Sequence, residues 1–207
     1  LTTTLTGSAT PATTNAWVSS NTAVTTIDNL GVVTGVSGGT AVITYTNSNG
    51  CKITAIVTVN ELPTINGNLA VCVGSTTAPT GSGTPATTNA WVSASPTIAT
   101  VDNTGLVSGI LNGTAVITYT NSNGCEIKAT VTVNPLPTIG GTLTVCAGST
   151  TTLTGSATPA TTNAWVSSNT AVATIDNLGE VTGVSEGTSV ITYTNSNGCK
   201  ITATLTV

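Results

Sequence analysis

One stretch of about 74 residues is written nearly three times in this chain, and a repeat of that length is a whole small domain rather than one turn of a solenoid. The tryptophans show the period most plainly, because Trp17, Trp91 and Trp165 are evenly spaced. Between residues 7–59 and 155–207, only six of 53 positions differ. The chain is therefore expected to fold as a tandem array, which usually supplies length, reach or valency.

Short proline-containing segments separate the copies, at residues 60–65 and 134–139. Proline stiffens such linkers by restricting the backbone. We expect three domains, at residues 1–60, 61–134 and 135–207. In this register the first copy lacks its opening strand and first cysteine, so we read the chain as a window from a longer array. Any secretion signal or anchor to cell-surface machinery is expected outside this segment.

Composition indicates an all-β protein without nucleic-acid partners. Threonine occurs 50 times, whereas Phe, Met, His and Arg are absent. Threonine and valine favour strands. The few charges sum to −4 with no basic cluster, which excludes binding to a run of phosphates. No apolar run is long enough to span a membrane as a helix.

The third copy predicts seven short strands with turn signals between them. They are expected at residues 142–146, 150–155, 163–167, 171–175, 180–184, 188–194 and 199–207. The Asn-Gly pair at 197–198 is typical of a hairpin turn, and the last strand alternates apolar and polar residues. This pattern predicts tandem immunoglobulin-like β-sandwich domains arranged as a rod.

The repeated aromatic residues are expected to anchor the cores. A lone tryptophan within a strand of a β-sandwich is far more often core than a sugar-stacking platform. The expected core anchors are Trp17, Trp91, Trp165, Tyr45, Tyr119 and Tyr193.

The five cysteines are the side chains from which covalent chemistry is expected in this chain. Cys51, Cys125 and Cys199 begin the last strand of each copy, and Cys72 and Cys146 end the first strand. With no histidine and no Cys-x-x-Cys spacing, neither a zinc site nor an activated thiolate is expected. Disulfides in an oxidising exterior are the expected role.

Two disulfide pairings remain open. Bridges within repeats would join Cys72 to Cys125 and Cys146 to Cys199. If successive strands reverse direction, however, these cysteines lie at opposite ends of a sandwich, and a disulfide tolerates only about 7 Å between Cα atoms. A bridge across repeats would join Cys72 to Cys199. In either case the partner of Cys51 is expected outside the chain.

No catalytic, cofactor or metal site is expected, so the chain is not predicted to be an enzyme. Asp28, Asp102 and Asp176 each begin an Asp-Asn-x-Gly turn, and one carboxylate per repeat is a poor calcium site. The Thr-x-Thr spacing invites an ice-binding interpretation, but Ig-like sheets twist and ice binding needs a flat array. We interpret these threonines as solvated strand faces.

Several motifs resemble a known family. The third copy contains Val-Cys-Ala-Gly-Ser-Thr at 145–150, Trp-Val-Ser-Ser-Asn at 165–169 and Gly-Thr-Ser-Val-Ile-Thr-Tyr at 187–193. These resemble the bacterial Ig-like domain, group 2. The added Val-Cys-x-Gly and Asn-Gly-Cys pair is similar to repeats in giant surface adhesins of Bacteroidetes. The resemblance implies a long extracellular filament exported to the cell surface.

We therefore expect the structural shaft of a long cell-surface adhesin filament, associated with the outer membrane and used for attachment and gliding motility. Its expected partners are neighbouring repeats and an extracellular surface or polysaccharide, touched by weak multivalent contacts. The alternative is an accessory binding or spacer array beside a secreted polysaccharide-active enzyme.

Overall fold

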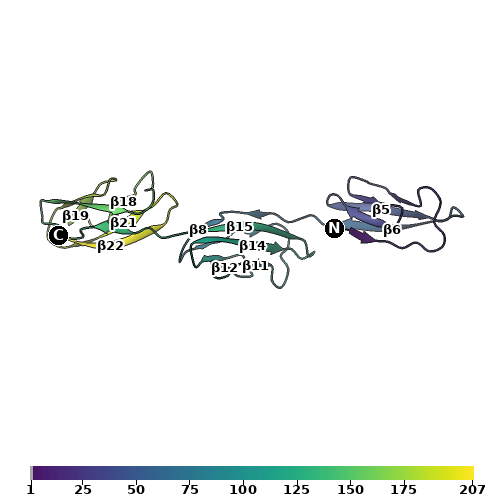
Figure 1. Cartoon of the computed structure of the whole chain (residues 1–207), viewed down its shortest axis with the longest axis horizontal. Helices are drawn as coiled ribbons and strands as arrows, with labels where there is room; N and C mark the ends of the chain where they lie inside the picture. Colours follow the sequence, from purple (N-terminus) through teal and green to yellow (C-terminus); the bar gives the residue numbers. More distant parts are fainter. Residues whose placement is uncertain (1) are drawn as a thin grey trace. The chain divides into compact units, whose positions relative to one another are not determined.

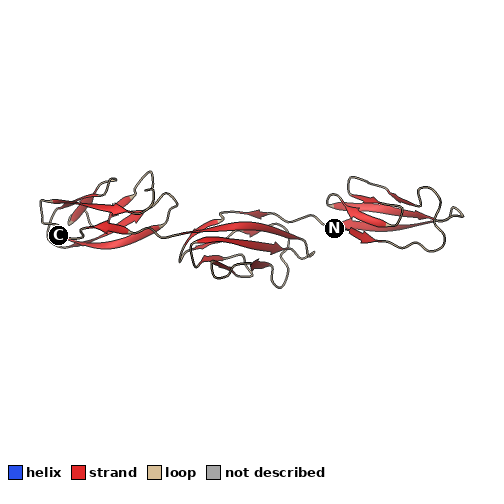
Figure 2. Ribbon diagram, in the orientation of Figure 1, coloured by secondary structure: helices blue, strands red, loops and turns tan. Residues whose placement is uncertain are grey.

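Every regular element in the described part of the protein is a strand (Figures 1 and 2). The computed structural model describes residues 2–207. Across this range it holds 22 β-strands and no helix, so no helix there is long and apolar enough to cross a membrane. The threonine- and valine-rich sequence suits a pleated, half-buried backbone.

The first repeat forms two three-stranded sheets. One has the order β1-β4-β3 and the other β2-β5-β6. The strands are β1 (Thr2–Thr4), β2 (Trp17–Ser19), β3 (Thr25–Ile27), β4 (Val32–Gly35), β5 (Gly39–Thr46) and β6 (Lys52–Val59). β5 and β6 form the long hairpin, pairing from Gly39↔Val59 to Thr46↔Lys52.

The second repeat adds strands from its opening segment. Its sheets have the orders β10-β7, β12-β13-β9 and β11-β14-β15-β8. The strands are β7 (Ile65–Asn66), β8 (Ala70–Cys72), β9 (Thr76–Thr77), β10 (Thr80–Gly81), β11 (Trp91–Ser93), β12 (Ala99–Val101), β13 (Val107–Gly109), β14 (Gly113–Thr120) and β15 (Glu126–Asn134). β8 runs parallel to β15, whereas β13 pairs antiparallel with both β12 and β9.

The third repeat forms the sheets β16-β17-β20-β19 and β18-β21-β22. The strands are β16 (Ile139–Gly141), β17 (Thr150–Gly155), β18 (Trp165–Ser167), β19 (Ala173–Ile175), β20 (Glu180–Gly183), β21 (Thr188–Thr194) and β22 (Lys200–Thr206). Opposed sheets in each repeat confirm the predicted tandem Ig-like β-sandwiches.

The opening segment changes sheet half-way along. β16 pairs antiparallel with β17, whereas Thr144 bridges Thr206 in parallel orientation. Gly141, between them, has a φ of 105°, and a Cβ there would lie 2.5 Å from the carbonyl oxygen of Thr152. Glycine permits both this conformation and this close approach. The strand predicted at 142–146 was therefore wrong, because that segment contributes only a bridge and the strand lies earlier.

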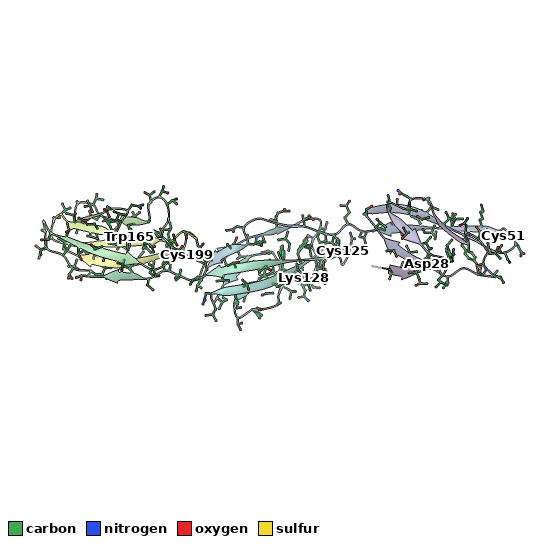
Figure 3. The ribbon with its side chains drawn as sticks, turned by 45° about the horizontal axis from the view of Figure 1, so that its top comes forward. Asp28, Cys51, Cys125, Lys128, Trp165 and Cys199 are labelled. Atoms are coloured by element: carbon green, nitrogen blue, oxygen red, sulfur yellow. A yellow bond between two sulfur atoms is a disulfide. The ribbon has the colours of Figure 1, made fainter. Side chains whose placement is uncertain are left out.

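The core of the third repeat takes side chains from both sheets. The buried cluster comprises Leu153, Ala164, Trp165, Ala173, Val181, Ile191, Tyr193 and Leu205. The Trp165 and Tyr193 rings lie 4.5 Å apart between centroids, tilted by 43°. Figure 3 labels Trp165 among the strands of this repeat. Burying each large apolar side chain contributes about 1.5–3 kcal/mol, so this cluster is what holds the two sheets together.

The compact units that packing defines differ from the repeats that sequence similarity defines. Every sheet lies within one predicted repeat. The chain instead forms two compact units. One comprises residues up to Thr64, 81–88 and 119–127. The other comprises residues 65–80, 89–118 and 128–207. The three-domain division at residues 60/61 and 134/135 therefore stays a prediction.

Candidate functional site

One series of cysteines is positioned by the hairpin before the last strand of each repeat. In the third repeat, the Asn195 Oδ1 accepts hydrogen bonds from the backbone N–H groups of Asn197 and Cys199, both at 3.0 Å. Gly198 completes the turn with a φ of 78°. The corresponding asparagines hold the other two hairpins, through Asn47 to Cys51 at 2.9 Å and Asn121 to Cys125 at 3.0 Å. Figure 3 shows these three cysteines, each at an end of its own repeat.

The second series follows the opening segment. Cys72 ends β8, and the next residue, Val73, donates its N–H to the Asn134 carbonyl at 3.0 Å. A tight turn at Gly74 (φ 77°) then brings the Ser75 N–H to the Cys72 carbonyl at 3.0 Å. Cys146 precedes the same turn, with Gly148 at φ 79° and the Ser149 N–H on the Cys146 carbonyl at 3.0 Å.

The structure joins one member of each series across two repeats. Cys72 and Cys199 form a disulfide, with their Cα atoms 5.6 Å apart and a sequence separation of 127. This Cα separation lies within the ordinary range for a disulfide. Cys199 is 1% exposed, so the bridge is shielded on that side.

The pairings within repeats do not form. Cys72 lies beside Asn134 in the parallel register of β8 and β15, at the far end of the strand that Cys125 precedes. That nine-residue strand holds the two thiols about 30 Å apart, at roughly 3.3 Å per residue. Cys51, Cys125 and Cys146 are free thiols. The Cys72–Cys125 and Cys146–Cys199 alternatives are therefore wrong, and a partner for Cys51 beyond this chain stays a prediction.

The repeated aromatic residues lie between the sheets. Trp91 and Trp165 are buried, Trp17 is half-buried, and all three partner tyrosines are buried. The Tyr193 hydroxyl donates to the Ala157 carbonyl at 2.9 Å, and a Cβ on Gly155 would collide with the Tyr193 ring. The first and second repeats show the same hydroxyl bond, from Tyr45 to Ala9 and from Tyr119 to Gly83. Buried rings tied in this way are not available for stacking on a sugar.

The repeated aspartates close turns. The Asp176 Oδ1 accepts the N–H groups of Leu178 and Glu180 at 2.9 and 2.8 Å. In the second repeat, the Thr104 hydroxyl donates to Asp102 at 2.7 Å, and this bond, with backbone N–H bonds, lowers the pKa of Asp102. Among residues 2–207, no three Cys, Asp or Glu side chains gather closely enough to hold a metal ion.

Family comparison agrees with this architecture. The bacterial Ig-like domain (group 2) matches residues 59–133 and 130–207. The chain belongs to this family. Membership accounts for the paired sheets and for the tandem arrangement of similar units.

Named relatives are more distant. Ice-binding protein 1 of Shewanella frigidimarina (strain NCIMB 400) is 30% identical over 215 residues, covering 91% of this chain and 24% of that protein. This chain thus spans about a quarter of that relative's length. The crystal structure of invasin, a bacterial integrin-binding protein, is 16% identical with a TM-score of 0.43, covering 96% of this chain and 52% of invasin. The S-layer protein rSbsC(31-844) is 18% identical with a TM-score of 0.34, covering 93% and 34%. At these identities the two structural likenesses concern the fold alone.

Two features of the site were not predicted from sequence. The first is the contact between each tyrosine ring and a glycine on a much earlier strand or loop of the same repeat, as at Gly155 and Tyr193. The second is the parallel pairing that sets Cys72 beside the end of β15. The repeated Gly7, Gly81 and Gly155 signalled the first feature, and Gly67, which has a φ of 107°, signalled the change of sheet behind the second.

Proposed function

We propose that this chain is part of the shaft of a long adhesin filament on the outer surface of a cell, serving attachment and gliding motility. Its anchor to the outer membrane would lie in other parts of the protein. Family membership supports a structural Ig-like role. The resemblance of its paired cysteine motifs to giant Bacteroidetes adhesins, most of all the SprB gliding-motility adhesin, supports the motility role.

The disulfide is the observation that carries this proposal. When the two ends of the chain are pulled apart, tension passes through the Cys72–Cys199 bond. Residues 73–198, which make up most of the second and third repeats, then lie outside the path of tension and cannot be drawn out. Such protection is useful in a filament that transmits force and is of little use to a free soluble domain.

The outer strand faces support weak, repeated contact with an extracellular surface or polysaccharide. On β22, Thr202, Thr204 and Thr206 are exposed, and opposite them on β21 Val190 is 40% exposed. Uncharged hydroxyl groups beside methyl groups make many individually weak contacts. Repetition of these contacts along an array then makes attachment strong, because each further contact becomes intramolecular once the first has formed.

A second candidate is a spacer or accessory array within a longer secreted binding protein or polysaccharide-active enzyme. The ice-binding relative favours it, because this chain matches only 24% of that protein. Direct ice binding by these repeats is not part of the proposal. Each strand in a sheet is twisted by roughly 20° relative to its neighbour, which prevents a flat threonine array.

Immunogold electron microscopy with an antibody against this chain tests the proposal on cells that produce the whole protein. Label strung along filaments that leave the outer surface is the expected result. Label confined to compact soluble particles in the medium would contradict the shaft and favour the accessory array. Cells lacking the corresponding gene provide the control for antibody specificity.

A further inference from the structure

Two exposed loops have the same sequence in all three repeats, although the repeats differ elsewhere. Between residues 75–133 and 149–207, 19 of 59 positions differ. The sequences Thr-Pro-Ala-Thr-Thr-Asn, at 158–163, and Asn-Ser-Asn-Gly-Cys, at 195–199, nevertheless occur unchanged in each copy. Most of their side chains are exposed in the third repeat. Core packing does not explain why exposed residues such as these stay the same.

The two loops form one surface that the backbone holds in place. In the third repeat, Pro159 forms an antiparallel bridge with Asn195. The Ser196 N–H donates to the Thr158 carbonyl at 2.7 Å. The same bridge occurs in the other two repeats, between Pro11 and Asn47 and between Pro85 and Asn121. A surface that is already ordered loses little conformational freedom when a ligand binds.

The backbone of these loops accounts for only some of the identical residues. Pro159 stands at the bridge, and Asn163 has a φ of 51°, a left-handed conformation that asparagine tolerates. The hydroxyl groups of Thr161, Thr162 and Ser196 have no such role. These three side chains are exposed, and none of their hydroxyl groups forms a hydrogen bond with another described residue. Donors and acceptors that the fold does not use are available to a ligand.

The chemistry of this surface favours an uncharged, hydroxyl-rich ligand. Neither loop contains a charged residue, and the next residue after the second loop is Lys52 or Lys200 in two copies but Glu126 in the other. A charged ligand would therefore be attracted at some copies and repelled at another. Hydroxyl groups both donate and accept, so they pair well with the hydroxyl groups of a sugar. Neither loop contains an aromatic ring for stacking, so each contact is expected to be weak.

We propose that the paired loops of each repeat bind an uncharged polysaccharide through the hydroxyl groups of two adjacent threonines and one serine. These residues are Thr13, Thr14 and Ser48 in the first repeat, Thr87, Thr88 and Ser122 in the second, and Thr161, Thr162 and Ser196 in the third. Three copies on one chain make the attachment multivalent. This surface is separate from the strand faces, and its use in attachment rests on the proposed function.

Affinity electrophoresis of the full chain tests the proposal. Each native gel contains one uncharged polysaccharide, either a β-glucan, a galactomannan or agarose, and a protein that binds the polymer migrates more slowly. At least one of the three should retard the wild-type chain. Thr161→Val and Thr162→Val, with the corresponding changes in the other two repeats, keep the side-chain shape and remove six hydroxyl groups. This loop variant should lose the retardation and keep the wild-type melting temperature, because those hydroxyl groups bond nothing within the protein.

The matched control removes six hydroxyl groups from the strand faces instead. It carries Thr188→Val and Thr206→Val, an exposed cross-strand pair, with the corresponding changes in the other repeats. This control should retain most of the retardation, since its loops are intact. Retardation by none of the three polymers, or equal retardation of the loop variant and the wild type, would overturn the proposal. Loss in the control alone would assign binding to the strand faces and would also overturn it. Labelling of filaments on cells does not depend on either variant, so the proposed shaft is tested separately.

Discussion

At the scale of single residues, each repeat is organised around a tyrosine whose ring packs against a glycine. The Tyr193 ring occupies the space that a side chain on Gly155 would need, and its hydroxyl reaches the Ala157 carbonyl. The ring thereby joins a long hairpin strand to the loop that leaves β17. Apolar burial and one directed hydrogen bond act on the same side chain, so small changes here should have a large effect on the stability of the repeat.

Substituting Gly155→Ala should therefore destabilise the third repeat by about 1–3 kcal/mol, the usual cost of forcing extra volume into a packed core. Calorimetry on the full chain should show a lower melting temperature for one transition. The matched control is Thr204→Ile, a change that the first repeat already carries as Ile56 on an exposed strand face. Equal melting temperatures for wild type and Gly155→Ala would show that the ring is not tightly held.

Ala157, whose carbonyl accepts the hydrogen bond from the tyrosine hydroxyl, is a position where a substitution should raise stability. Ala157 has a φ of 64°, and the second repeat has Gly83 at this position with a φ of 75°. A left-handed conformation costs an L-residue about 1–2 kcal/mol, whereas glycine gives back roughly 0.5–1 kcal/mol through unfolded-state entropy. Ala157→Gly should therefore stabilise the third repeat by about 0.5–1 kcal/mol in thermal or chemical unfolding. Ala147→Gly, in a loop without positive φ, should stabilise nothing; equal gains from both variants would contradict this explanation.

At the scale of elements, the strands that sequence predicted best are those whose own residues carry the pattern that defines them. Strands β17 and β21 have the predicted bounds, and the Asn-Gly turn at 197–198 follows β21 directly. The opening segment was predicted less well, since its two halves pair with different sheets and Gly141 sets the point of change. Alternation alone cannot tell which neighbour a strand will find, and here one half pairs with the next strand, β17, whereas Thr144 pairs with Thr206 near the end of the repeat.

The turn after β12 should carry a measurable pH dependence. The Thr104 hydroxyl and neighbouring N–H groups lower the folded-state pKa of Asp102. A carboxyl whose pKa is lower when folded contributes stability above its unfolded pKa, near 3.9, and loses it as the pH falls through the folded pKa. Asp102→Asn should thus be less stable than wild type near neutral pH, and the difference should shrink in acid. Thr104→Val removes the largest cause and should weaken the acid dependence; parallel stability–pH curves would contradict this assignment.

At the scale of the whole molecule, the sequence showed an array but not how its parts are joined. Repetition and the threonine- and valine-rich composition already indicated an array of Ig-like domains. The disulfide pairing stayed open, because five cysteines in a repeated pattern allow bridges within or across repeats. The structure has the bridge across repeats, between Cys72 and Cys199, because β8 ends where β15 ends. This linkage gives the array a covalent path for tension that no single repeat contains.

Single-molecule force spectroscopy of the full chain, pulled from its two ends, tests that path most directly. With the disulfide intact, the sequence separation of 127 between Cys72 and Cys199 should keep roughly 440 Å of contour length hidden, at about 3.5 Å per extended residue. Reductant, or Cys72→Ser, should release that length, whereas Cys146→Ser should change nothing. Full extension of the oxidised wild-type chain, equal to that of the reduced chain, would contradict the bridge as a path for tension and with it the proposed shaft.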